Sequence, residues 1–181
     1  MIPRFAPTYT YSDLLWAFKN CNREELRTEL QSRLRDYFGV KHVFLVNSGK
    51  EAIYAILKVY DRPGGVLTPA YSCIEVAKAV SQAGYFPVFI DNELDTLNIN
   101  IRSIKKSLSD EITIILPVHI FGIPCNMEEI RNGSSHTNRL ILEDAAPAFG
   151  AKLNGKPVGK FGDASVISFH WTKTISGEGG G

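Results

Sequence analysis

Residues 43–59, VFLVNSGKEAIYAILKV, contain the pattern from which the fold is predicted. The apolar run at residues 43–46 predicts a buried strand, and the polar residues 47–50 predict a turn. Aliphatic residues then recur at helical spacing on one face of residues 51–59, which predicts a helix. We therefore expect a strand, a turn and a helix in succession here.

The same alternation continues along the rest of the chain. Short apolar runs predict strands, and periodic segments between them predict helices. Such alternation, with nearly continuous apolar strands, is typical of a parallel sheet covered by helices on both faces. We therefore predict an α/β fold of three layers, αβα, with a mainly parallel sheet. Further strands are expected over residues 64–68, 85–90, 112–118, 140–142 and 165–169, with helices ending at residues 81, 108 and 131.

Residues 1–40 precede this alternation and have a different pattern. Ser12 is expected to cap a short helix. Asn22 is expected to cap a second helix through a capping box, and Gly39 is expected to end it. We predict that residues 1–40 form a helical segment packing on the main domain. Residues 41–181 are predicted to form one incomplete domain.

The composition excludes several classes of function. Lys and Arg number 20 and Asp and Glu 19, a net charge of +1, which argues against nucleic acid as a partner. No run of about 18 apolar residues and no signal-peptide plan is present, so we predict a cytoplasmic protein without a membrane partner. The cysteines and histidines lack disulfide or metal-site spacing. Free buried thiols are expected at Cys21, Cys73 and Cys125.

Four polar stretches are expected to converge on one edge of the sheet. Ligands of parallel sheets bind outside the carboxyl ends of the strands, and each stretch follows a predicted strand. The stretches are residues 48–50, residues 71–73, Asp144 and residues 168–173. Tyr71 either packs over a ligand ring or fills the core. Together they predict a ligand site at this edge.

Each candidate also has a plain structural interpretation. The turn at residues 48–50 offers backbone N–H groups and Lys50 to an anion, yet it matches neither GxGxxG nor the Walker pattern and can be a simple connection. Asp144 can bind a cationic nitrogen of a ligand, or it can cap a helix or loop. His119 can line the same edge or be a hydrogen-bonded framework group. Glu143 is expected to face the other side of the sheet.

Lys173 follows the last predicted strand and precedes the glycine-rich run GEGGG at residues 177–181. It is either an ordinary surface lysine or a partly desolvated nucleophile that can form a Schiff base. A pyridoxal phosphate site needs such a lysine, a carboxylate on the ring nitrogen and a phosphate cradle. Lys173, Asp144 and the turn at residues 48–50 supply candidates for all three.

The ordered motifs of the chain also resemble those of a known family. Along its length the chain is similar to the DegT/DnrJ/EryC1/StrS group of pyridoxal-phosphate-dependent sugar aminotransferases. The resemblance implies the large domain of the aspartate aminotransferase-like fold (fold type I), incomplete at the C-terminus and without the small C-terminal domain. The motifs are VNSGKEAI (46–53), TPAYSC (68–73), PVFIDNELDTLNI (87–99), PVHIFGIPCNMEEI (117–130), LEDAAPAFGA (142–151), FGDASVISFHWTK (161–173) and GEGG (177–180).

The resemblance implies a role for each site residue. Lys173 corresponds to the lysine that forms the Schiff base and moves a proton during transamination. Asp144 corresponds to the aspartate that keeps the pyridine nitrogen protonated. Gly49 and Lys50 fall at the phosphate-binding turn, and Ser168 falls at the position whose hydroxyl joins them.

Three positions depart from the usual pattern of the family. Cys73 stands where many members stack an aromatic ring on the cofactor. Pro147 stands where members often carry a side chain that bonds the phenolic oxygen of the cofactor, and proline has no donor to offer. Lys50 replaces the usual threonine. Cofactor binding is still expected, with stacking that is thinner or comes from another residue.

The resemblance also implies substrates and partners. The amino donor would be glutamate and the acceptor a nucleotide-linked keto sugar, in aminosugar or surface polysaccharide biosynthesis. Family sites lie at a dimer interface, so a homodimer or a complementing C-terminal half is expected. Two alternatives are a cofactor-binding or subunit-pairing module without turnover, and a plain nucleotide-binding domain that uses residues 48–50.

Overall fold

The computed structural model describes residues 9–19, 22–134, 138–177 and 179–181. A five-stranded sheet has the order β2-β1-β3-β4-β7, and all neighbouring strands are parallel. Leu67 is paired with Val88 on one side and Ile115 on the other. The predicted parallel α/β architecture is therefore confirmed. The strands are β1 (Gly65–Pro69), β2 (Phe86–Ile90), β3 (Ile112–Ile115), β4 (Leu140–Asp144) and β7 (Ala164–Val166).

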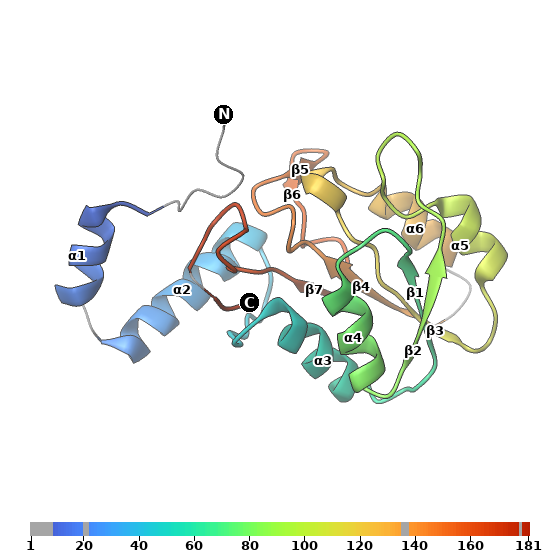
Figure 1. Ribbon diagram of the computed structural model, residues 1–181, viewed down its shortest axis with the longest axis horizontal. Helices are drawn as coiled ribbons and strands as arrows, with labels where there is room; N and C mark the ends of the chain where they lie inside the picture. The colour runs from blue at the N-terminus through green and yellow to red at the C-terminus, as the bar shows by residue number, and fades with distance from the viewer. Residues whose placement is uncertain (1–8, 20–21, 135–137, 178) are drawn as a thin grey trace.

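Helices cover both faces of this sheet, as predicted (Figure 1). One core cluster joins α3 and α4 to the sheet, and a second joins α5 and α6 to it. Neighbouring strand residues contribute to different clusters: Ile114 belongs to the first and Ile115 to the second, because successive side chains of a strand point to opposite faces. The helices are α3 (Gly49–Tyr60), α4 (Ile74–Gln82), α5 (Ile101–Ser107) and α6 (Met127–Ser134).

Three short elements complete the main body. The 3-10 turn η1 (Ile120–Gly122) follows β3, and the two-stranded hairpin of β5 (Lys152–Leu153) and β6 (Lys156–Pro157) lies between β4 and β7 in the chain. None of the helices that the structure describes is long and apolar enough to cross a membrane.

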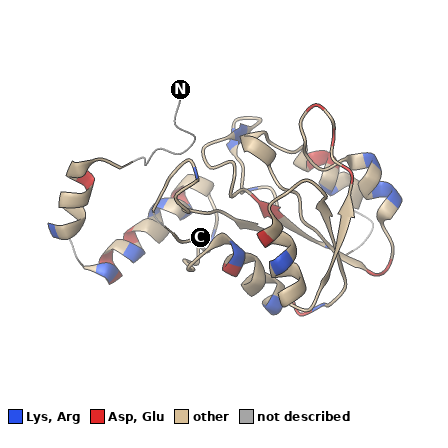
Figure 2. Ribbon diagram, in the orientation of Figure 1, with Lys and Arg blue, Asp and Glu red and all other residues tan. Residues whose placement is uncertain are grey.

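The N-terminal helices extend away from the sheet (Figure 1). α1 (Tyr11–Lys19) buries none of its residues, whereas α2 (Arg23–Phe38) buries Leu34 and Phe38 near its end. Figure 2 shows basic and acidic residues interspersed along α2, α3 and α4. Neither sign of charge therefore dominates these three helices.

One of the two predicted caps is correct. The Asn22 side chain accepts from the N–H of Glu25, and Gly39 ends α2 in the left-handed conformation. The predicted cap at Ser12 is wrong, because α1 begins one residue earlier and Ser12 lies inside it. Thr10 takes that role: its Oγ1 accepts from the N–H of Asp13, and its own N–H donates to the Asp13 carboxylate at 2.6 Å.

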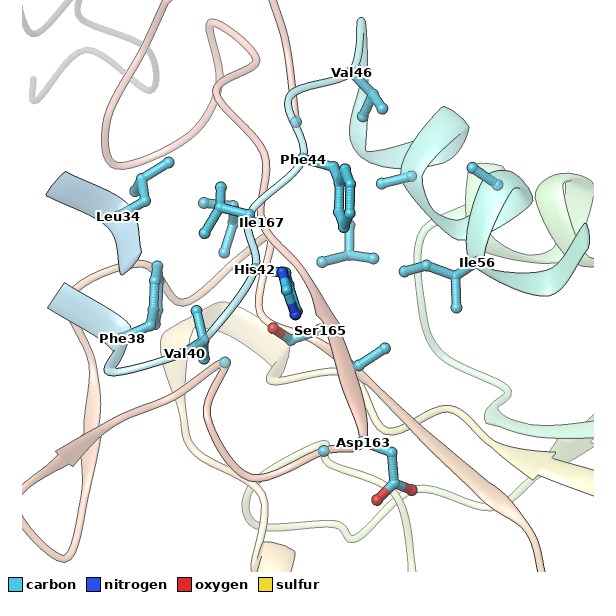
Figure 3. Close-up of a pocket in the computed structure, with 18 of the residues that line it drawn as sticks. Leu34, Phe38, Val40, His42, Phe44, Val46, Ile56, Asp163, Ser165 and Ile167 are labelled. Atoms are coloured by element: carbon cyan, nitrogen blue, oxygen red, sulfur yellow. The ribbon is translucent and has the colours of Figure 1, made fainter. Parts of the chain in front are cut away.

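The predicted buried strand at residues 43–46 is also wrong. These residues are in no strand, and Phe44 is 80% exposed. Only Val46 exchanges backbone hydrogen bonds as a strand residue would, with Gly181. Residues 40–46 line a groove beside β7 (Figure 3). Within the described residues, no strand lies next to them, so they do not join the sheet.

Two strands, β3 and β7, end earlier than predicted. β3 stops at Ile115, although the N–H of Leu116 still donates to Leu67 O, and Pro117 follows without a donor of its own. β7 stops at Val166. Both chain segments then turn toward the carboxyl edge of the sheet, where the predicted site residues lie.

Candidate functional site

The carboxyl end of β7 and the residues that follow it lie beside the beginning of α3. A Cβ atom built on Gly49 would be 3.3 Å from Ser168 Cβ and 3.6 Å from the carbonyl oxygen of Ile167. Only a residue without a side chain therefore lets the first turn of α3 approach Ser168 without displacement. The structure thus brings together Gly49 and Ser168, which are far apart in the sequence.

Asp144 is the last residue of β4 and is buried. Its Oδ1 accepts a hydrogen bond of 2.9 Å from the N–H of Ala146. Burial raises the pKa of the Asp144 carboxyl above its usual value, and the Ala146 N–H and the positive charge of Lys173 oppose that rise. Asp144 and Lys173 are therefore close enough to interact electrostatically, as the sequence predicted.

Lys173 lies in a turn after β7 and is half-buried. Its N–H donates to His170 O at 2.8 Å, and the N–H of Gly177 donates to Phe169 O at 2.8 Å. Ser168 is buried, and its Oγ accepts from the N–H of His170 at 3.3 Å. These backbone hydrogen bonds close residues 168–177 into a compact loop. The loop keeps Lys173 near the end of β7, where its side chain is half-buried.

The first turn of α3 is fixed by a cap. The N–H of Glu51 donates to Ser48 Oγ, and the Glu51 carboxylate accepts from the N–H of Asn47, both at 3.1 Å. The Ser48 side chain accepts from the N–H of Glu51 only. The N–H groups of Gly49 and Lys50, like the first N–H groups of any helix, have no partner within the helix. Together with the positive end of the helix dipole, such N–H groups can bind an anion.

The Lys50 side chain is directed to a neighbouring helix. Its Nζ lies 3.1 Å from the Glu75 carboxylate in the first turn of α4, and Glu75 also binds Lys78. Hydrogen bonds from Lys78 and then Lys50 hold the pKa of the Glu75 carboxyl below its usual value. The Lys50 side chain therefore joins α3 to α4 by its ion pair with Glu75. The group of Lys50 that remains available to an anion is its backbone N–H.

The prediction of buried thiols is right for one cysteine and wrong for another. Cys125 is buried, and burial raises the pKa of its thiol to about 12. Cys73 is exposed, because it is the N-cap residue of α4, where the chain turns at the sheet edge. Cys21 lies outside the described residues. The exposed Tyr71 ring lies near that of Phe121, with centroids 6.2 Å apart, so it faces the edge and not the core.

His119 belongs to a buried network and not to the open edge, in agreement with its framework interpretation. The N–H of Cys125 donates to His119 Nδ1 at 2.8 Å, which leaves the proton on Nε2. Nε2 donates to the Glu143 carboxylate at 2.8 Å. Both side chains are fully buried.

Glu143 also accepts from the backbone N–H groups of Gly159, Phe161 and Gly162. Burial favours the neutral form, but the hydrogen bond from His119 and those from the backbone outweigh it, so the pKa of the Glu143 carboxyl lies below its usual value. The sequence placed Glu143 on the face opposite Asp144 but did not indicate this network. The only signal was the acidic pair at a strand end.

Within the described residues, no group of three or more His, Cys, Asp or Glu side chains could hold a metal ion. The arrangement at the edge is a half-buried amine, a buried carboxylate and a helix N-terminus beside a hydroxyl. These are groups for a ligand that carries an anion at one end and a basic nitrogen at the other.

The model of the DegT/DnrJ/EryC1/StrS aminotransferase family matches residues 19–181. The chain belongs to this family. A transaminase of Shigella dysenteriae, dTDP-4-amino-4,6-dideoxy-D-glucose transaminase, is 33% identical over 99% of this chain and 49% of the relative. GDP-perosamine synthase of Caulobacter vibrioides is 36% identical over 84% of the chain and 42% of the relative. The chain thus spans about half the length of the curated relatives it matches.

Solved structures of sugar-modifying enzymes share the fold. A GDP-4-keto-6-deoxymannose-3-dehydratase with a trapped PLP-glutamate geminal diamine is 26% identical, with a TM-score of 0.90 over 98% of this chain and 50% of that one. DesI in the presence of its TDP-sugar product is 27% identical, with a TM-score of 0.84 over 94% of this chain and 44% of that one. The predicted aspartate aminotransferase-like α/β architecture agrees with these neighbours, which include pyridoxal-phosphate-dependent sugar enzymes.

Proposed function

We propose that this chain provides the cofactor-binding part of a pyridoxal-phosphate-dependent aminotransferase that moves an amino group from glutamate to a nucleotide-linked keto sugar. The observation that carries the proposal is that the half-buried Lys173, in the turn after β7, lies near enough to the buried Asp144 at the end of β4 for its charge to act on that carboxyl. A lysine and a carboxylate in this relation are what the cofactor requires.

The residues present fit the cofactor. The approach of Gly49 to Ser168 makes a cradle that a Cβ atom would crowd, and the N–H groups of Gly49 and Lys50 suit a phosphate. The Asp144 carboxylate accepts one hydrogen bond among the described residues, from Ala146, and so retains acceptor capacity. A protonated pyridine nitrogen would supply both the charge and the donor that a buried carboxylate needs.

Pyridoxal phosphate, when bound, supplies a carbonyl carbon that reacts with amines and a ring that accepts electrons. Lys173 would hold it by its amine and would carry a proton between donor and acceptor atoms of the substrate complex. Asp144 would keep the ring nitrogen protonated. Ser168 and the first turn of α3 would bind the phosphate, and Cys73, at the start of α4, would lie against the ring.

The names of the relatives support the proposed substrates. Their activities concern dTDP-linked and GDP-linked sugars, which supports aminosugar or surface polysaccharide biosynthesis as the role of this chain. We propose a cytoplasmic location, as the sequence analysis expects. We further propose that residues 1–40 form a helical segment that packs on the partial domain of residues 41–181 through the end of α2, where Leu34 and Phe38 are buried. We also propose that a homodimer or a complementing C-terminal half completes the active enzyme.

The glutamate half-reaction tests this function. The chain is loaded with pyridoxal phosphate, the bound cofactor is quantified by absorbance, and L-glutamate is added. We expect about one 2-oxoglutarate per loaded site, none from Lys173→Ala, and an unchanged yield from Lys152→Ala, which alters an exposed lysine of the β5–β6 hairpin. A loaded chain that releases no 2-oxoglutarate, alone or with a complementing half, would instead be a binding module without turnover.

A further inference from the structure

The Asp144 carboxylate makes few contacts that fix its position. Among the described residues it accepts one hydrogen bond, from the N–H of Ala146 two residues later. A bond over so short a span fixes the carboxyl relative to its own turn and not relative to the rest of the sheet edge. The backbone of Asp144 must therefore determine where the carboxyl lies.

The backbone of Asp144 is paired on both sides. On one side, β4 lies in regular parallel register with β7. On the other side, the N–H of Asp144 donates to Pro117 O at 2.9 Å, and the N–H of His119 donates to Asp144 O at 3.2 Å. Residues 117–119 lie beyond the end of β3, so the ladder of that strand does not hold them there. Another contact must keep these three residues against Asp144.

The His119 side chain provides that contact. Its Nδ1 accepts from the N–H of Cys125 and its Nε2 donates to the Glu143 carboxylate, both at 2.8 Å. Both side chains are fully buried, so water does not compete for these bonds. Residues 117–119 are therefore bound to β4 twice, through their backbone to Asp144 and through the imidazole to the residue before it.

Glu143 also binds the segment on the other side of Asp144. Its carboxylate accepts from three backbone N–H groups of residues 159–162, the segment that leads into β7. Gly159 has a φ of +95°, a conformation that favours glycine and that lets the backbone approach the carboxylate. One carboxylate on the far face of β4 thus connects the two segments that lie on either side of Asp144.

The loop that follows His119 has an anchor of its own. Asn98 is buried; its side chain accepts from the N–H of Ile120 and donates to Ile123 O, both at 3.0 Å. Loss of the His119 side chain would therefore leave the η1 turn in place. The loss would act where residues 117–119 meet Asp144.

We propose that His119 is a positioning residue for Asp144 and that it acts through the Glu143 carboxylate on the opposite face of β4. The inference rests on the proposed function, because Asp144 is the group that would contact the ring nitrogen of the cofactor. A small displacement of such a group weakens the contact it is there to make. His119 keeps Asp144 in the position at which its carboxylate meets that nitrogen.

Two substitutions of His119 test the proposal in the chain without cofactor. In His119→Gln the amide nitrogen takes the place of Nε2 and still donates to Glu143, whereas the shorter side chain of His119→Asn does not reach it. Exchange of the Asp144 amide is measured by NMR. We expect it to accelerate at least about tenfold in His119→Asn and about threefold or less in His119→Gln, with the amides of β2 unchanged in both.

A comparison of two ligands extends the test to the cofactor. One is pyridoxal phosphate, and the other is its analogue with carbon in place of the ring nitrogen, which offers nothing to Asp144. His119→Asn should weaken binding of pyridoxal phosphate about 10-fold and change that of the analogue less than about twofold, since only the first ligand uses the carboxylate. His119→Gln should bind both ligands like the wild type.

Three results would overturn the proposal: unchanged Asp144 exchange in His119→Asn, equal acceleration in β2, or equal weakening of both ligands. Should His119→Asn not fold, Cys125→Ala replaces it, because this change removes only the thiol hydrogen bond to Val118 O, 3.3 Å long. Faster Asp144 exchange is again expected, and unchanged exchange overturns the proposal. A wild-type chain that binds neither ligand contradicts the proposed function instead, and the exchange comparison then decides the positioning role alone.

Discussion

At Asp144, the charged form that the proposed chemistry requires is the form that lowers the stability of the fold. Its carboxyl is buried at the end of β4, and its pKa is raised by that burial. A raised pKa means that the folded state binds the proton more tightly than the unfolded state. The charged form therefore lowers stability as the pH rises above the ordinary value of about 3.9. The fold tolerates this cost at the position where a cationic ligand nitrogen would offset it.

Asp144→Asn is expected to separate the two effects. At pH 7 the variant should unfold at a urea concentration no lower than the wild type, because an uncharged amide replaces a poorly solvated carboxylate. Its affinity for pyridoxal phosphate should fall about 10-fold to 100-fold, since a charge-assisted hydrogen bond is lost. Asp95→Asn, in an exposed loop, serves as the matched control. Unchanged cofactor affinity in Asp144→Asn would remove the carboxylate from the site.

The two described cysteines differ in environment, and alkylation rates report that difference. In the folded chain at pH 8, iodoacetamide should modify the exposed Cys73 and leave Cys125 unmodified, because burial raises the pKa of Cys125 to about 12 and blocks access. Peptide mapping before and after unfolding in urea measures this. Pyridoxal phosphate should slow the reaction of Cys73 if that thiol lies against the cofactor. Rapid labelling of Cys125 in the native chain would contradict the described packing.

At the scale of elements, hydrogen bonds to the Glu143 carboxylate connect the end of β4 to the segments that follow β3 and precede β7. It joins His119, which follows β3, to Gly159 and Gly162 of the segment before β7, while its neighbour Asp144 faces the opposite side of β4. The N–H of Asp144 also donates to Pro117 O at 2.9 Å. The position of Asp144 therefore depends on a network on the far face of the sheet.

Glu143→Gln should destabilise the chain and remove part of its pH dependence. Because the folded pKa of Glu143 lies below its ordinary value, the carboxylate contributes stability above about pH 4.3 that is lost as the pH falls through the lowered folded pKa. The glutamine variant cannot titrate. It should lose about 1–3 kcal/mol at pH 7, because hydrogen bonds to a charged acceptor are replaced by weaker or unsatisfied ones, and show a shallower acid limb in urea unfolding. Glu128→Gln, exposed on α6, should match the wild type; an unaltered acid limb in Glu143→Gln would contradict the assignment.

At the scale of the whole molecule, the sequence was enough to predict what depends on local pattern. The parallel sheet, the helices on both faces and the Asn22 cap followed from apolar runs, helical spacing and capping residues. Convergence of Asp144 and Lys173 followed from their places after parallel strands. Each of these features follows from preferences of residues that are close together in the sequence, and these preferences all point to the same fold.

What could not be predicted depends on partners distant in the sequence. Residues 43–46 have the composition of a buried strand, but a strand needs neighbours, and the groove beside β7 leaves these residues without them. The exposure of Cys73 results from its place at the sheet edge and not from its type. The four donors to Glu143 come from two segments distant in the sequence, His119 and residues 159–162, and no spacing in the sequence indicates them.

The central claim is that Lys173 holds the cofactor with Asp144 beside it, and reductive trapping tests it most directly. The chain is saturated with pyridoxal phosphate, reduced with borohydride and mapped by peptide mass spectrometry. We predict one pyridoxyl group per chain, on Lys173, and its loss in Lys173→Ala but not in Lys50→Ala. An unmodified Lys173 in the saturated chain, or a label that survives Lys173→Ala undiminished, would contradict the claim.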